Sequence, residues 1–397
     1  MQNNNHKLDF QDTETAFSDK TDAELREKYR MFKMMNSPIL NGIGTTAANF
    51  ALSIGLPVEW IIKNTVFEQF CGGETIEECD PTIDKLGNSN IGTILDYSVE
   101  GKSTEEDFER TKEETILNLK RAKNDVDIPF AVFKVTGIAP IGTLEKISDG
   151  VELAKKSNIT KWENAKRRVN EICEYAHSIQ QPVFIDAEES WIQNAIDLLA
   201  TEMMEKYNRE LPIIFNTIQL YRHDRLDYLK ESHAEAKAKG YILAVKLVRG
   251  AYMEKERDRA SEMDYDSPIQ PDKAATDRDY DLAIDYCLEN IEDIAFVAGT
   301  HNEKSVQMLA QKIAEKGFDH NHPHIFFSQL YGMSDNLSYV LADNNFNVSK
   351  YVPYGPVADA VPYLIRRAKE NSSVTGQVSR ELDLISKEIE RRKRNGN

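Results

Sequence analysis

Residues 242–250 read ILAVKLVRG and show the unit from which most of the chain is built. The short apolar run over Ile242–Val248 predicts a buried strand, and the charged Arg249 with Gly250 marks its end. A helical stretch follows. Seven further runs of this kind are Ile91–Tyr97, Phe130–Thr136, Pro182–Ala187, Ile213–Gln219, Ile294–Thr300, His324–Ser328 and Val348–Pro353.

Eight strands that alternate with helices predict a (β/α)8 TIM-like barrel of the α/β class. The helical pattern is clearest over residues 163–180, where apolar residues share one face. A doubly wound sheet is the alternative, but it rarely needs eight evenly repeated units. We expect residues 1–88 to form a disordered start, to about residue 20, and then a helical arm. The arm is expected to pack its apolar face on the barrel of residues 89–397, with membrane contact as the alternative.

Polar side chains gather at the ends of the predicted strands. The βα loops build the active site of a barrel at this end, so these residues predict chemistry there. They are Asp96, Lys134, Asp186, Glu188, Gln219, Tyr221, Lys246, Arg249, Thr300, His301 and Tyr351. Two extra helices follow the last strand, over residues 359–370 and 378–392. The second has Val378, Leu382, Ile385 and Ile389 at helical spacing, which predicts a docking face.

The charge and the cysteines exclude several classes of protein. The formal net charge of −17 repels a phosphate backbone, so we expect no nucleic-acid partner. The four cysteines form no CxxC pair and no His and Cys run has metal spacing, so neither a disulfide framework nor a metal site is expected. The sequence shows no secretory signal and no apolar run that could span a bilayer, which predicts a cytoplasmic protein. The basic residues 391–394 suit peripheral contact with the inner face of a membrane.

Four short motifs resemble those of proline dehydrogenases, in that family's order along the chain. They are KLVRGAY at 246–252, GTHN at 299–302, QLYGM at 329–333 and LIRR at 364–367. The resemblance implies an FAD-dependent enzyme that oxidises L-proline to 1-pyrroline-5-carboxylate by hydride transfer, the first step of proline catabolism. It also implies that electrons pass to a membrane quinone and that a separate 1-pyrroline-5-carboxylate dehydrogenase acts next.

The resemblance places Arg366 and Arg367 at the carboxylate of proline. Arginine offers paired planar donors that suit a carboxylate, although neighbouring helix residues point about 100° apart. Without the motif, such a pair would be expected on a solvated surface. The other residues assigned to the substrate are Lys134, Asp186, Tyr351, Leu330 and Tyr252. Lys134 and Asp186 are also open to interpretation as a structural ion pair, and Tyr351 favours proline over hydroxyproline.

The resemblance also implies a set of residues that bind FAD. Lys246 stands where many relatives have an arginine, and either cation would favour negative charge near the flavin. No GxGxxG follows a strand, so a Rossmann turn is not expected to hold the cofactor. His301, taken alone, would more often be a structural histidine. The assigned residues are Gln219, Lys246, Val248, Gly250, Lys273, Thr300, His301, Asn302, Glu370 and Ser372.

Two other functions fit a barrel of this kind. A flavin barrel of the methylenetetrahydrofolate reductase type needs a folate-sized pocket and a nicotinamide site, whereas paired arginines suit a small carboxylate. A non-catalytic barrel that binds a small molecule would not need so many polar side chains at its strand ends. A purified protein without flavin would support this second alternative.

Overall fold

The computed structural model describes residues 8–35, 67–97, 103–150, 155–357, 359–360 and 377–396. Eight strands follow one another around a closed barrel in their order along the chain, which confirms the predicted fold class. They are β1 (Gly92–Tyr97), β2 (Phe130–Lys134), β3 (Val183–Asp186), β4 (Ile214–Gln219), β5 (Leu243–Val248), β6 (Ile294–Gly299), β7 (Ile325–Leu330) and β8 (Val348–Tyr354). All eight predicted strands are found, with ends that differ by at most two residues.

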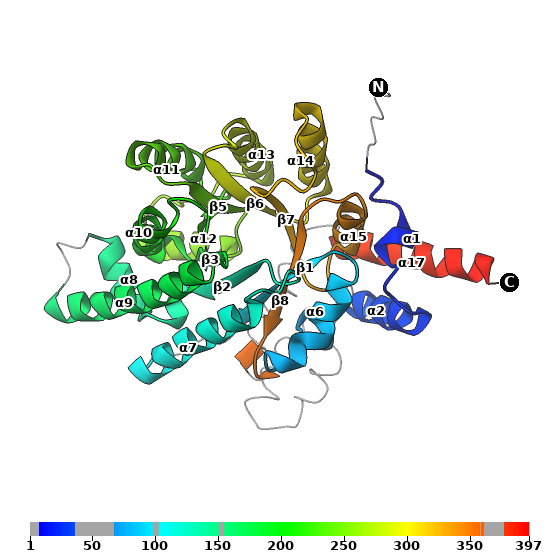
Figure 1. The fold of residues 1–397 in the computed structure, drawn as a ribbon, viewed down its shortest axis with the longest axis horizontal. Helices are drawn as coiled ribbons and strands as arrows, with labels where there is room; N and C mark the ends of the chain where they lie inside the picture. Colours follow the sequence, from blue (N-terminus) through cyan, green and yellow to red (C-terminus); the bar gives the residue numbers. More distant parts are fainter. Residues whose placement is uncertain are drawn as a thin grey trace. The chain divides into compact units, whose positions relative to one another are not determined.

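The chain divides into two compact units, one of residues 101–328 and one of residues 1–100 with 329–397. The predicted domain boundary after residue 88 stays a prediction. In the first unit, neighbouring strands from β2 to β7 pair in parallel, and helices α9, α10, α11, α13 and α14 lie outside them (Figure 1). Its helices are α7 (Glu105–Ala122), α8 (Ile141–Ser148), α9 (Lys156–Ser178), α10 (Ser190–Tyr207), α11 (Arg225–Lys239), α12 (Met253–Met263), α13 (Lys273–Glu289) and α14 (Glu303–Lys316), with the 3-10 turn η3 (Val135–Gly137).

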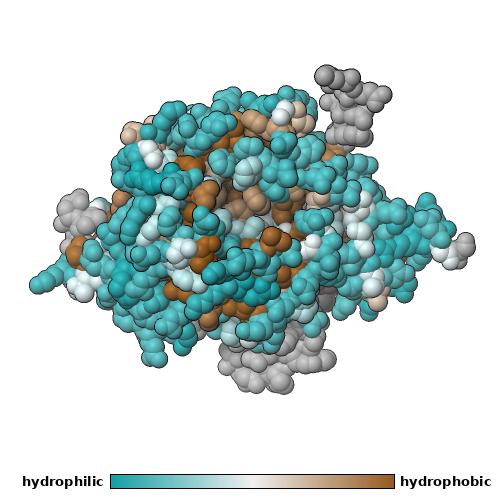
Figure 2. Space-filling view, viewed as in Figure 1, coloured by the Kyte–Doolittle hydropathy of each residue, from teal (hydrophilic) through white to brown (hydrophobic). Residues whose placement is uncertain are grey.

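Aromatic rings fill the inside of this unit near the start of its strands. Phe130 stacks on Phe184 with ring centres 4.5 Å apart, and Phe215 and Phe326 meet Phe130 edge to face at 5.4 and 4.9 Å. Side chains alternate along a strand, so residues two and four positions after these rings also face inward. The polar residues at the carboxyl ends therefore lie above an apolar floor. Figure 2 shows that the visible surface is mostly hydrophilic.

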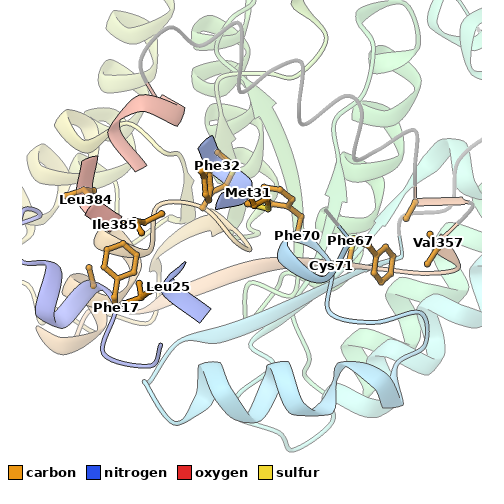
Figure 3. Packing of buried hydrophobic residues seen from close by; sticks show 13 residues of the cluster. Phe17, Leu25, Met31, Phe32, Phe67, Phe70, Cys71, Val357, Leu384 and Ile385 are labelled. Atoms are coloured by element: carbon orange, nitrogen blue, oxygen red, sulfur yellow. The ribbon is translucent and has the colours of Figure 1, made fainter. Parts of the chain in front are cut away.

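The second unit contains the parallel pair β1 and β8, with Ile94 opposite Tyr351. A buried cluster joins its N-terminal and C-terminal segments, and Phe17, Leu25, Phe32 and Ile385 all belong to it (Figure 3). The elements are α1 (Thr13–Ala16), α2 (Asp22–Met35), α5 (Glu68–Phe70), η2 (Glu77–Cys79), α6 (Asp80–Gly87), α15 (Asp335–Asp343) and α17 (Gln377–Asn395).

Four buried charged side chains connect four elements of the second unit. Asp335 accepts hydrogen bonds from Lys28 of α2 (2.5 Å) and from Lys350 of β8 (2.9 Å), and Glu381 of α17 accepts one from the backbone N–H of Ser334 (2.6 Å). Burial by itself raises the pKa of Asp335, but the charges of Lys28 and Lys350 hold it well below its usual value. The cluster contains two acidic and two basic side chains, and the ion pairs of Asp335 with Lys28 and Lys350 make its burial tolerable.

Two expectations about the chain ends can be compared with the structure. Residues 8–20 were expected to be disordered, and this is wrong: Asp12 caps helix α1, and Phe10 and Phe17 are buried. The few apolar residues there are sufficient because α17 supplies the surface they pack against. The docking face of α17 is confirmed, with Ile385 buried and Leu382 and Ile389 packed on the same cluster. Among the described helices, none is both long and apolar enough to cross a bilayer.

Candidate active site

Four predicted site residues lie at the carboxyl ends of neighbouring strands. Lys134 ends β2, Asp186 ends β3, Gln219 ends β4 and Val248 ends β5. Each ends a strand whose other residues are mostly buried. Because side chains alternate, Asp186 shares the inward face of β3 with Phe184. The fold thus brings the polar groups of Lys134, Asp186 and Gln219, from three neighbouring strands, to one end of the barrel.

Asp186 lies between two lysines. Lys246 donates a hydrogen bond through Nζ to Oδ1 of Asp186, and the Nζ of Lys134 lies 3.6 Å from Oδ2. The Lys246 ammonium also lies 4.9 Å from the centre of the Phe184 ring. The three charged side chains are 19% exposed or less, so these charges interact in a largely buried setting. Lys246, which is assigned to FAD, is thus joined through Asp186 to Lys134, and both Asp186 and Lys134 are assigned to the substrate.

Glu188 lies two residues after Asp186 on the same segment and is 4% exposed. Its carboxylate accepts a hydrogen bond from the backbone N–H of Thr136 at 3.0 Å and another from the Thr136 hydroxyl. Burial raises the pKa of Glu188 from 4.5 to about 7, against the opposing effect of the Thr136 hydrogen bonds. The sequence placed Glu188 at a strand end but assigned it no ligand. The only signal was its position two residues after Asp186.

Gln219 is fixed at one end of its amide and unpaired at the other. Its Nε2 donates to the carbonyl of Glu188 at 3.0 Å, while its buried Oε1 has no hydrogen-bond partner among the described residues. A buried acceptor without a donor is costly in a folded protein and points to a missing partner. The ring edge of a flavin carries both donors and acceptors, so Gln219 fits the predicted cofactor.

Gly250 makes the turn after β5 possible. Its φ of +131° is unfavourable for other residues, and a Cβ there would lie 2.4 Å from the ring of Tyr221. Burial, followed by the charge of Glu256, raises the pKa of Tyr221 well above its usual value, and its hydroxyl has no partner among the described residues. Gly250 therefore has a packing role, which does not exclude the predicted contact with FAD.

Arg249 connects three segments of the first unit. Its guanidinium donates to Asp277 (2.7 Å), to the hydroxyl of Thr300 (2.7 Å) and to the hydroxyl of Ser305 (2.9 Å). Its charged end also lies 4.2 Å from the centre of the Tyr280 ring. Arg249 lies at a predicted strand end, but no ligand was assigned to it from the sequence. Its hydrogen bond contributes to the orientation of Thr300, whose hydroxyl also accepts from the backbone N–H of Asn302 at 3.0 Å.

Three residues assigned to FAD also have structural partners. Asn302 caps α14, because its Oδ1 accepts from the backbone N–H groups of Lys304 (3.0 Å) and Ser305 (3.3 Å). Lys273 is two thirds exposed and pairs with Asp277. His301 is half-buried between Thr300 and this cap. A helix N-terminus suits a diphosphate, so the placement of Asn302 is compatible with its predicted role.

Three other predicted residues belong to different elements. Tyr252 precedes α12 as its N-cap and is half-buried. Tyr351 is a buried residue of β8 in the second unit, and its carbonyl accepts from the N–H of Tyr331 at 2.9 Å. Leu330 is the half-buried last residue of β7. The remaining calls lie outside the described residues: Arg366, Arg367, Glu370 and Ser372.

Comparison with known proteins gives consistent matches over most of the chain. The family model described as "Proline dehydrogenase" matches residues 79–380. The chain is 32% identical to proline dehydrogenase 1, mitochondrial, of Dictyostelium discoideum, over 98% of this chain and 76% of that protein. It is 33% identical to the carbapenem antibiotics biosynthesis protein CarD of Pectobacterium carotovorum, over 81% and 83% of the two chains. It is 32% identical to hydroxyproline dehydrogenase of Xenopus laevis, over 84% and 79%.

Solved structures share the fold at lower identity. Proline utilization A (PutA) from Bdellovibrio bacteriovorus, inactivated by N-propargylglycine, matches with a TM-score of 0.73 and 20% identity. The match covers 92% of this chain and 38% of that chain. A mutant PutA of Bradyrhizobium japonicum matches with a TM-score of 0.66 and 22% identity, over 80% and 32%. The chain therefore spans well under half the length of these PutA chains.

Proposed function

This chain belongs to the proline dehydrogenase family, and on that premise we propose that it transfers a hydride from C5 of L-proline to bound FAD. The family makes it an oxidoreductase that acts on proline in proline catabolism. Loss of the hydride from C5 and of a proton from nitrogen gives 1-pyrroline-5-carboxylate. A membrane quinone is the proposed electron acceptor, and a 1-pyrroline-5-carboxylate dehydrogenase would oxidise the product further.

The observation that carries this proposal is the placement of Asp186 between Lys134 and Lys246 at the end of the barrel strands. We assign Lys134 to the carboxylate of proline, together with Arg366 and Arg367 on the strength of the LIRR motif. Charge-assisted hydrogen bonds from such cations are among the strongest in proteins. Asp186 then orients Lys134, because their charged groups lie 3.6 Å apart.

The substrate ring is assigned to Tyr351, Leu330 and Tyr252. Relatives include a hydroxyproline dehydrogenase as well as proline dehydrogenases, so ring specificity has to be decided by this chain's own residues. A bulky tyrosine at position 351 leaves less room for a ring hydroxyl, which favours proline. The expected outcome is a kcat/KM for L-proline well above that for hydroxyproline.

Most of the residues that we assign to FAD end strands, follow strands or begin helices in the first unit. The unpaired Oε1 of Gln219 supports this assignment, and Lys246 supplies a buried cation that favours negative charge on the ring. The N-terminus of α14, with Thr300, His301 and Asn302, suits the diphosphate. The other assigned residues are Val248, Gly250, Lys273, Glu370 and Ser372.

An anaerobic titration of the purified protein with L-proline tests flavin and substrate together. The protein is expected to be yellow, and the flavin absorbance should bleach as proline is added. A colourless protein that gains no colour with added FAD would refute the proposal and support a non-catalytic binder. Bleaching by NADH but not by proline would support the methylenetetrahydrofolate reductase alternative.

A further inference from the structure

Glu256 is a charged residue of α12 whose side chain is completely buried. Its carboxylate accepts a hydrogen bond from the backbone N–H of Ser190 at 2.6 Å and another from the Ser190 hydroxyl at 2.5 Å. Ser190 is the first residue of α10. A carboxylate from one helix therefore caps the N-terminus of another.

Helix α10 depends on this cap. The side chain of its own N-cap residue, Glu189, makes no capping hydrogen bond within the described residues. The first N–H groups of a helix have no partner inside the helix, and the helix dipole favours negative charge at this end. Glu256 supplies both the acceptor and the charge, so the contact stabilises a specific placement of α12 against α10.

The segment between β3 and α10 is held from two sides. On one side, the carboxylate of Glu188 binds Thr136, which follows β2. On the other side, Ser190 binds Glu256. Asp186 begins this segment and is separated from each of these anchors by only a few residues. Its position therefore depends on both contacts.

The same contact fixes the start of α12. The backbone N–H of Glu256 donates to the carbonyl of Tyr252 at 2.9 Å, which closes the first turn of the helix. Tyr252 follows the tight turn at Gly250 that ends β5. Anchoring the side chain of Glu256 thus anchors the turn that presents Tyr252.

We propose that Glu256 is a positioning residue for substrate binding, which sets Tyr252 and the Asp186 segment relative to each other through its contact with Ser190. The proposal rests on the proposed function, in which Tyr252 contacts the proline ring and Asp186 orients Lys134 at the proline carboxylate. Glu256 acts through these residues and is not assigned to the substrate. Two other ion pairs hold α12, Lys255 with Glu189 and Arg259 with Glu145, but each includes a partner that is 29% exposed or more. Exposed pairs of this kind contribute little.

Kinetic measurements on three variants of the FAD-loaded protein test the proposal. Glu256→Ala is expected to raise the KM for proline about tenfold, equivalent to ~1.4 kcal/mol, with a much smaller change in kcat, because binding contacts are displaced while the reacting groups remain. Glu256→Gln should restore most of the affinity, because its amide can accept from the Ser190 N–H and donate to the Ser190 hydroxyl. Glu145→Ala removes an exposed tether of the same helix and is the matched control, with an unchanged KM expected.

Hydrogen exchange at the start of α10 provides a readout that does not depend on activity. The Ser190 amide should exchange faster in Glu256→Ala than in wild type or in Glu145→Ala. Ser190→Ala keeps the backbone N–H but loses the hydroxyl, so its KM should lie between those of wild type and Glu256→Ala. This milder variant is expected to fold even if Glu256→Ala does not. Faster exchange with an unchanged KM would overturn the positioning role, as would an equal rise of KM in Glu145→Ala. A wild-type protein that proline does not reduce would refute the proposed function instead, while the exchange data would still report on the contact.

Discussion

Lys246 of β5 donates a hydrogen bond to Asp186 of β3, so a cation and an anion on strands separated by β4 are paired inside the barrel. The family resemblance assigns these two residues to different ligands, Lys246 to FAD and Asp186 to proline. Their pairing means that a change at one residue alters the electrostatics of both assigned sites. Double changes at these positions are therefore not expected to be additive.

Replacing Asp186 with asparagine should destabilise the protein and impair substrate oxidation. The change leaves Lys246, which is 6% exposed, without its counter-charge, and breaking a buried ion pair costs about 3–5 kcal/mol. Urea unfolding should show a loss of this order, and kcat/KM for proline should fall together with it. Asp285→Asn removes a surface pair with Lys312 and should cost less than about 1 kcal/mol. If Asp186→Asn has the same free energy of unfolding as wild type, the prediction is contradicted.

Glu188 should make the stability of the protein decrease between about pH 4.5 and pH 7. Its pKa is raised by burial from 4.5 to about 7, so the folded state binds this proton more tightly than the unfolded state. The resulting stabilisation is fully present below the unfolded pKa and is lost as the pH rises through the folded pKa, with a total of roughly 3 kcal/mol. Glu188→Gln should remove most of this decrease.

The measurement is the free energy of unfolding in urea at about pH 5 and about pH 8. The comparison between wild type and Glu188→Gln isolates the contribution of Glu188. Glu171→Gln is a suitable control. Burial opposes ionisation of Glu171, but hydrogen bonds from Lys112 and Arg167 lower its pKa, so its contribution is lost only below about pH 4.5 and should not change between pH 5 and pH 8. An identical pH dependence in Glu188→Gln and wild type would refute the prediction.

Two substitutions at Asn302 should separate its capping role from its proposed contact with FAD. Asn302→Ala removes the cap of α14 and should cost about 1 kcal/mol of stability. Asn302→Asp keeps the cap but adds a negative charge beside the proposed diphosphate site, so stability without cofactor should be preserved while the Kd for FAD rises. Urea unfolding of the cofactor-free protein and a fluorescence titration with FAD measure the two effects. Unchanged FAD affinity in Asn302→Asp would remove this residue from the proposed site.

Asp335→Asn should destabilise the second unit strongly. Lys28 and Lys350 are both buried and would lose their shared anion, at a cost of about 3–5 kcal/mol in urea unfolding near neutral pH. Burial by itself would raise the pKa of Asp335, but Lys28 and Lys350 lower it well below its usual value. The contribution of Asp335 to stability is therefore present above the unfolded pKa and is lost as the pH falls through the folded pKa. The variant should therefore lose less stability in acid than wild type. If wild type and Asp335→Asn lose the same free energy of unfolding in acid, the prediction is contradicted.

The sequence predicted the strands correctly because a buried strand is a local pattern. A run such as Phe130–Thr136 contains its own apolar residues and its own breakers, and β2 forms within it. The polar ends of these runs also predicted that Lys134, Asp186, Gln219 and Lys246 meet at one end of a barrel. The family motifs assigned chemistry to them. Their individual roles at proline and FAD remain predictions.

Contacts between distant segments were not visible in the sequence. Glu256 lies among charged residues of a helix and would be read as solvated, yet it binds Ser190, which lies 66 positions earlier in the chain. Lys28 likewise reaches Asp335 across 307 positions. Residues 8–20 looked too polar to fold because their packing surface belongs to α17.

The sequence by itself therefore determined the barrel, the end at which its polar residues gather and the family, since strand patterns and motif order are local properties of the chain. Only the tertiary structure decided which charged residues are buried and what they bind. Burial of a charge depends on which distant groups meet it, and its cost is compensated only by partners such as Lys246 for Asp186 and Ser190 for Glu256.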